Sequence, residues 1–129
     1  SLDERIVFQK KIYFLQKFGA MKTPEYRFSW YFYGPYSSVA ASDVFSFFDE
    51  DKDKEISIDD SILRKFVEFS SHIDDSKTWE MVASIHYLLM QGKTKEEIFD
   101  QVSKKRSYLK DKELFDKMWK LLSDIKLIQ

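Results

Sequence analysis

Residues 26–37, with the sequence YRFSWYFYGPYS, decide the expected fold of this chain. The strict alternation over residues 26–33 is typical of a β-strand with one buried face. Four aromatic residues are expected on that buried face: Tyr26, Phe28, Trp30 and Phe32. Proline removes a donor from a strand ladder, so Gly34 and Pro35 are expected to end the strand, and Ser37 or Ser38 to begin a helix. We therefore interpret Gly34, Pro35 and Ser37 as a structural corner between strand and helix.

The other face of this strand is the candidate working surface. Tyr31 and Tyr33 point away from the expected core, and Tyr36 lies just beyond the corner. Tyrosine suits an interface, because its ring buries apolar area while its hydroxyl keeps a hydrogen bond. Tyr31, Tyr33 and Tyr36 are thus the candidate partner-binding residues. The alternative is that later helices cover this face and bury the sheet on both sides.

Outside this stretch the pattern is helical. Apolar residues recur at helical spacing, and the start signals predict six helices that begin at Glu4, at Ser37 or Ser38, at Asp59 or Asp60, at Ser76 or Thr78, at Thr94 and at Asp111. Thr94 with Glu97 forms a capping box. Residues 55–58 (EISI) are a candidate second strand. The expected fold is α+β and mainly helical, with a small two- or three-stranded antiparallel sheet, as one domain over residues 1–129.

The amino-acid composition excludes several classes of metal site and catalytic site. The chain has no cysteine and two histidines, which excludes thiolate metal sites, a cysteine nucleophile and a three-histidine site. Its three isolated glycines build no phosphate loop, and no GxSxG elbow is present. His86 lies on an apolar stripe and is interpreted as structural. No signal-peptide layout or membrane span is visible, so we expect a soluble cytoplasmic protein. Because the motifs named above are missing, we expect no cofactor, no metal and no enzymatic activity.

The acidic segment Asp49–Asp60 is a candidate calcium loop. Its spacing resembles an EF-hand, with Asp49, Asp51, Asp53, Ser57 and Asp60 at the positions of the oxygen ligands. Lys54 stands where the loop needs glycine for its sharp turn, and Asp60 is one methylene shorter than the bidentate glutamate. The sequence therefore favours a solvated acidic turn, and an EF-hand-like calcium binder stays an alternative.

One basic cluster, Lys104-Lys105-Arg106, lies before the last helix. With the last three helices it could form a winged-helix-like DNA-binding unit. The last helix, however, interleaves opposite charges, with Glu113 four residues before Lys117 and Asp116 four before Lys120. A solvated helix face with ion pairs is thus favoured, and nucleic-acid binding is the second alternative.

Two segments together resemble a known family. Residues 10–16 (KKIYFLQ) and then Tyr33-Gly34-Pro35-Tyr36-Ser37 follow the pattern of the uncharacterised YwgA-like bacterial and archaeal proteins. More distantly, the chain is similar to the Panacea domain of SocA-like antitoxins. The resemblance implies a non-enzymatic protein-interaction or regulatory module, with toxin neutralisation as one role and a toxin as one class of protein partner. It transfers no catalytic residue and names no oligomeric state.

Overall fold

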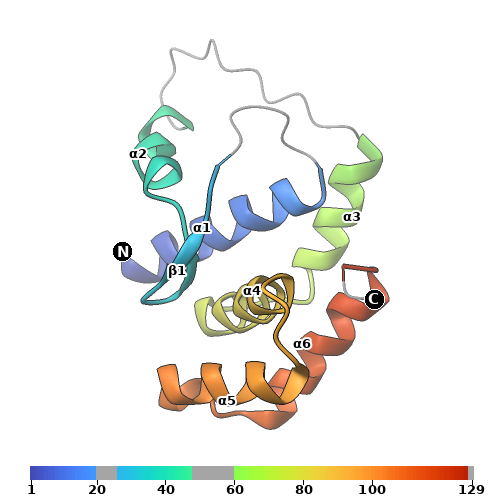
Figure 1. Ribbon diagram of the computed structural model, residues 1–129. Coiled ribbons are helices and arrows are strands. Elements are labelled where there is room, and N and C mark those ends of the chain that lie inside the picture. The colour runs from blue at the N-terminus through green and yellow to red at the C-terminus, as the bar shows by residue number, and fades with distance from the viewer. Residues whose placement is uncertain (20–25, 48–59, 128–129) are drawn as a thin grey trace.

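The computed structural model describes residues 1–19, 26–47 and 60–127 (Figure 1). Along the chain, the described elements are α1 (Leu2–Lys17), β1 (Ser29–Tyr31), β2 (Gly34–Tyr36), α2 (Ser38–Phe47), α3 (Asp60–Ser70), α4 (Ser76–Met90), α5 (Lys95–Lys105), the short 3-10 helix η1 (Ser107–Leu109) and α6 (Lys112–Asp124). Six helices and a two-stranded antiparallel sheet confirm the mainly helical α+β fold. The candidate strand over residues 55–58 lies outside the described residues.

Helix α4 forms the centre of the molecule. It packs against α1, β2, α5 and α6, and Figure 1 shows it between α1 on one side and α5 on the other. Residues 79–86 and Leu88 of this helix are all buried. Its neighbours contribute Phe14, Phe69, Val102, Phe115 and Leu122 to the same core. Burial on nearly every side makes α4 the element on which the others are assembled.

The helix ends follow their sequence signals. The side chain of Thr94 accepts from the N–H of Glu97 at 3.2 Å, and the carboxylate of Glu97 accepts from the N–H of Thr94 at 3.0 Å. This reciprocal pair confirms the capping box. Asp111 likewise accepts from the N–H of Leu114 at 3.0 Å and begins α6. Helix α4 begins at Ser76, one of its two predicted starts, and its cap is Asp75, whose carboxylate accepts from the N–H of Thr78 at 2.9 Å. Such caps satisfy donors that a helix N-terminus leaves unpaired.

The strand prediction needs correction. The strand spans Ser29–Tyr31 and not residues 26–33, and it pairs with Gly34–Tyr36 in a hairpin with Tyr31 opposite Gly34. Gly34 and Pro35 therefore form the second strand and do not end the first. Phe32 lies in the tight turn with 63% of its surface exposed, so its assignment to the buried face was wrong. Tyr26 is buried, and Phe28 and Trp30 are partly buried against the core, as predicted.

Gly34 explains why the turn closes where it does. Its φ is +93°, whereas neither Phe32 nor Tyr33 has a positive φ. A type I turn followed by a residue in the left-handed region is a common three-residue hairpin loop, and glycine adopts that region without steric cost. A Cβ on Gly34 would also lie 2.6 Å from Ser84 Oγ of α4. Glycine thus gives the hairpin both its turn and its close approach to α4.

Ser37 has the capping role that the sequence suggested. Its hydroxyl accepts from the N–H of Ala40 at 3.1 Å, and α2 begins at the next residue. The corner into the helix therefore lies at Ser37, three residues after Gly34. No helix in the described ranges is both long and apolar enough to cross a membrane.

Candidate interaction groove

The three predicted interface tyrosines lie around one groove. Tyr31 of β1 is 52% exposed, and Tyr33 and Tyr36 are partly exposed. The rings of Tyr31 and Tyr36 stack across the two strands, with centroids 5.1 Å apart and an interplanar angle of 28°. Phe32 packs beside Tyr31, with centroids 4.8 Å apart. The hairpin therefore presents a continuous aromatic surface that no helix of the described chain covers at Tyr31 and Phe32.

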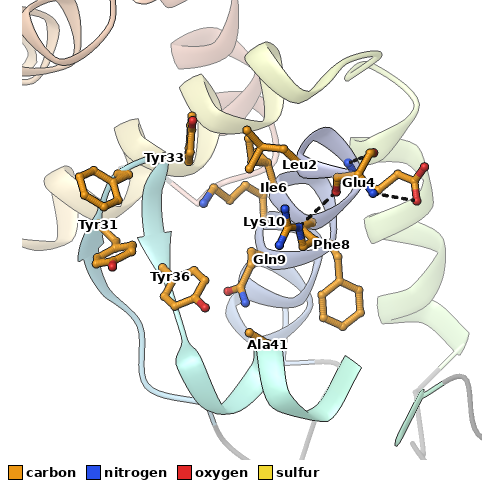
Figure 2. Close-up of a pocket in the computed structure, with 13 residues that line it drawn as sticks. Leu2, Glu4, Ile6, Phe8, Gln9, Lys10, Tyr31, Tyr33, Tyr36 and Ala41 are labelled. Carbon is orange, nitrogen blue, oxygen red and sulfur yellow. Dashed lines mark hydrogen bonds and ion pairs between the residues drawn. The ribbon is translucent and has the colours of Figure 1, made fainter. Parts of the chain in front are cut away.

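The groove has a volume of about 540 Å³ and runs between the hairpin and one face of α1. Figure 2 shows Tyr31, Tyr33 and Tyr36 on one side and the side chains of α1 on the other. The lining residues from α1 and α2 are half apolar and half polar or charged: Leu2, Ile6, Phe8 and Ala41, with Glu4, Arg5, Gln9 and Lys10. We call this site, with its hairpin tyrosines, the hairpin groove. Volumes of 300–1,000 Å³ are typical of binding clefts.

The floor of the groove is fixed by side chains that bind the main chain. Gln9 is buried, and its amide donates to the carbonyl oxygen of Ser37 and accepts from the N–H of Ser37, both at 3.0 Å. Gln16 makes the same pair of hydrogen bonds with Tyr26, at 2.8 and 2.5 Å. Each glutamine thus pairs with both the N–H and the carbonyl oxygen of one residue, as a neighbouring strand would. Gln16 holds the segment before the hairpin, and Gln9 holds the segment after it. These hydrogen bonds hold the hairpin against α1.

Lys10 contributes a charged anchor to the same floor. It is 1% exposed, and its Nζ donates to the carbonyl oxygen of Pro35 at 2.8 Å. Burial lowers the pKa of Lys10 to about 7, although the charge of Glu80 acts in the opposite direction. A buried lysine that retains one main-chain acceptor is a specific, costly arrangement. Sequence reasoning missed Gln9 and Lys10 as lining residues of the groove, and it missed Gln16 as the residue that holds the main chain of Tyr26.

Two of the three cations in the basic cluster bind the hairpin, whereas Lys104 is exposed and pairs with Asp100. Lys105 donates to the carbonyl oxygen of Tyr31, and Arg106 donates to that of Phe32 at 3.0 Å. The Lys105 ammonium lies 4.0 Å from the ring centre of Trp30, and the Arg106 guanidinium lies 4.4 Å from that of Tyr33. Both are attractive cation–π distances. These two cations therefore bind groups of this chain.

The charges of α6 pair differently from the prediction. The structure pairs Lys112 with Asp116 and Lys120 with Asp124, each four residues apart, and Lys95 of α5 also reaches Asp116. Glu113 with Lys117 and Asp116 with Lys120 are not among the ion pairs of the described residues. The prediction of a solvated helix face with ion pairs is still correct, because exposed ion pairs between residues four positions apart form along α6.

His86 has the structural role that was expected. It is 3% exposed, and its Nδ1 is hydrogen-bonded to the hydroxyl of Tyr13 at 2.6 Å. Burial lowers the pKa of His86 to about 4 and raises that of Tyr13. The histidine is therefore neutral at pH 7 and joins α4 to α1. No group of three or more potential metal ligands occurs among the described residues. The candidate calcium loop lies outside them except for Asp60, which begins α3.

Comparisons of the chain with protein-family models, with curated proteins and with solved structures give no match. The resemblance to YwgA-like proteins and to the Panacea domain stays an expectation from the two sequence segments. In the structure the two segments are in contact, because the Nζ of Lys10 donates to the carbonyl oxygen of Pro35 at 2.8 Å.

Proposed function

We propose that this chain is a non-enzymatic protein-interaction module that binds a protein partner in the hairpin groove. The observation that carries the proposal is the open aromatic surface at Tyr31 and Phe32, which are 52% and 63% exposed. Large exposed aromatic side chains beside a concave apolar site are typical of binding surfaces. The groove has an aromatic wall from the hairpin and a mixed apolar and polar wall from α1, so a partner segment that enters it buries area on two sides.

The rigid backing of the hairpin supports the same proposal. Gln9, Lys10, Lys105 and Arg106 fix its main chain from α1 and from the end of α5. A surface that is ordered before binding loses less conformational entropy when the partner arrives. The resemblance to antitoxins makes a toxin the first class of partner to test, with regulation by protein binding as the broader role.

Nucleic-acid binding is the weaker proposal. Phosphate binding needs cations that face solvent, yet Lys105 and Arg106 donate to hairpin carbonyl oxygens, and Lys104 pairs with Asp100 at 2.9 Å. These interactions favour the protein partner. Duplex binding with a strong salt dependence and a Kd near 10⁻⁸ M would reverse this preference.

Site-specific photo-crosslinking tests the proposal. A benzoyl-phenylalanine is placed at Phe32 in the full chain, and the matched control carries it at Met90, which is 54% exposed at the end of α4. We expect one partner to be crosslinked from position 32 and not from position 90. The purified partner should then bind the wild-type chain, and Tyr31→Ser with Phe32→Ser should weaken its Kd at least tenfold, by about 1.4 kcal/mol.

Two results would contradict the proposal. One is equal crosslinking from positions 32 and 90, which indicates collision and not recognition. The other is a purified partner whose affinity is unchanged by the Tyr31→Ser and Phe32→Ser double variant.

A further inference from the structure

A second hollow lies along α1, next to the hairpin groove. Its volume is about 600 Å³, and it lies between α1 and the residues that lead into α4. Glu4 and Phe8 line both sites, so the two have a common wall. Figure 2 shows Glu4 and Phe8 on the side of α1 farther from Tyr31. The two sites are therefore neighbours on one surface, and one bound segment can reach both.

The second hollow is acidic. Its lining holds four carboxylates and one cation beside less polar groups: Asp3, Glu4, Asp74, Asp75 and Lys11, with Val7, Phe8 and Ser76. We call it the acidic pocket. All four acidic residues are exposed. In the hairpin groove the carboxylate of Glu4 is accompanied by Arg5 and Lys10, so the excess of negative charge belongs to the acidic pocket and not to the groove.

The described chain leaves most of this negative charge without a cationic partner. Among the described residues, Asp3, Asp74 and Asp75 form no ion pair. Lys11 is the cation of the lining, and its ammonium lies 5.8 Å from the ring centre of Trp79. Carboxylates that share a site repel one another, and a bound cation relieves that repulsion. The acidic pocket therefore attracts positive charge.

The two sites together are complementary to a segment with two properties. Tyr31 and Phe32 give the groove an exposed aromatic wall, which loses water when an apolar side chain covers it. The acidic pocket attracts a cation and repels an anion. A segment that is only apolar uses the groove alone, and an acidic segment is repelled by the pocket.

We propose that the partner binds through a basic and apolar segment: an apolar or aromatic side chain occupies the hairpin groove, and a neighbouring lysine or arginine enters the acidic pocket. This assignment rests on the proposed function, because the groove is the same binding surface. It adds the chemistry of the partner, which the aromatic wall of the groove does not specify. The binding energy comes mainly from the groove, and the acidic pocket selects the charge of the segment.

Three fluorescein-labelled peptides test the proposal with the full chain. They share one apolar centre of leucine and phenylalanine, and their flanks carry lysine and arginine, or serine, or aspartate and glutamate. In fluorescence anisotropy at low salt we expect the basic peptide to bind about tenfold more tightly than the serine peptide, and the acidic peptide to bind most weakly. At about 1 M NaCl, where the Debye length is about 3 Å, this ranking should be largely lost.

A double variant places the charge effect in the acidic pocket. Asp3→Asn with Asp74→Asn removes two of its charges, and an amide oxygen at position 3 can still accept from the hydroxyl of Ser76. Asp75 is left intact because it caps α4. We expect the basic peptide to bind about fivefold more weakly and the serine peptide to bind as before, since an exposed ion pair contributes a small factor.

The matched control is Glu96→Gln with Glu113→Gln. It removes two exposed carboxylates from the first turns of α5 and α6, outside both sites. We expect it to change the binding of the basic peptide by less than about twofold. Equal losses in the two double variants would show attraction to the net charge of the chain and would overturn the proposal.

Tyr31→Ser with Phe32→Ser separates this proposal from the proposed function. If this variant loses binding while the three peptides bind alike, or while Asp3→Asn with Asp74→Asn has no effect, the groove remains the binding surface and the basic segment is wrong. A lack of binding by all three peptides also overturns the basic segment, whereas photo-crosslinking from position 32 still decides the proposed function. A wild-type chain that sediments as a dimer, and as a monomer after Phe32→Ser, would make a second copy the occupant and overturn the proposal.

Discussion

The hairpin and the helices around α4 are stabilised in different ways. The helices bury apolar side chains against one another, as Phe115 and Leu122 of α6 do against α4. The hairpin has three residues in each strand and no third strand among the described residues. An isolated two-stranded hairpin is marginal in water. It is held here by polar side chains of distant segments that bind its main chain.

This difference predicts how each region responds to change. The helical region depends on buried volume and on a neutral His86, whereas the hairpin depends on specific donors and acceptors such as Gln9 and Lys10. Deleting a buried methylene usually costs less than leaving a buried polar group without a partner. The following predictions separate the two regions, from the largest expected effect to the smallest.

Acidification should weaken the packing of α4 on α1 first. The pKa of His86 is about 4 in the folded chain, below the ordinary value of 6.5. A group whose pKa is lowered by folding in this way contributes stability that is present above pH 6.5 and is lost as the pH falls towards 4. The loss is about 3 kcal/mol at pH 4. Urea unfolding between pH 7 and 4 measures it.

The control for this prediction is His86→Gln, whose neutral amide can still form a hydrogen bond with Tyr13 and does not titrate. The variant keeps every carboxylate, so the difference in pH slope between it and the wild type isolates His86. Parallel slopes over pH 4–6.5 would show that the histidine does not set the acid response.

A second prediction compares two glycines with positive φ. Gly34 has φ +93° and lies against Ser84, whereas Gly92, after α4, has φ +85° and no atom within 4 Å of an added Cβ. We expect Gly92→Ala to cost about 1 kcal/mol of unfolding free energy, from backbone strain alone. Gly34→Ala should cost about 2–3 kcal/mol, because the methyl group also displaces Ser84.

The double variant Gly34→Ala with Ser84→Ala sharpens this comparison. Removing the hydroxyl should recover the part of the cost that exceeds that of Gly92→Ala, as seen in denaturant midpoints. If the double variant is no more stable than Gly34→Ala, the whole loss of unfolding free energy comes from backbone strain in the turn. That result would contradict the close packing of the hairpin on α4.

A third prediction concerns the glutamine floor. Gln9→Ala leaves the N–H of Ser37 without its partner in a buried site, whereas the carbonyl oxygen of Ser37 still accepts from the N–H of Ala41 at 3.1 Å. We expect a loss of about 2 kcal/mol, and the matched Gln91→Ala, at an exposed position, should change stability by less than about 0.5 kcal/mol. Hydrogen exchange should place the Gln9→Ala loss at the hairpin and α2. Equal losses in the two variants would remove the distinction between the regions.

The helical half was predictable from the sequence because its signals are local. The capping box at Thr94, the cap at Asp111 and the apolar spacing lie within one or two helical turns. The hairpin was only partly predictable. Alternation identified β1, but Pro35 was interpreted as a strand end, since proline usually marks one. Here Pro35 pairs with Trp30 in a two-stranded sheet, in which each strand is an edge strand and an edge strand can accommodate proline.

The anchors of the groove were not predictable for a related reason. Gln9 and Ser37 are separated by 28 positions, and Lys105 and Tyr31 by 74. Polar residues such as Gln9 and Lys10 on an amphipathic helix are normally interpreted as solvated. Only the folded chain shows that they satisfy the main chain of another segment. The candidate partner-binding tyrosines were chosen by residue type, and the structure places all three around one groove.

The smallest expected effect on stability belongs to the aromatic tip, and it separates surface from core. Tyr31→Ser removes a ring that is 52% exposed and that stacks on the ring of Tyr36. We expect unfolding free energy to change by no more than about 0.5 kcal/mol. Trp79→Ser, at a 2% exposed position of α4, should cost at least about 3 kcal/mol under the same conditions. A comparable loss for Tyr31→Ser would mean that its ring stabilises the fold, and the hairpin would then be part of the core and not a binding surface.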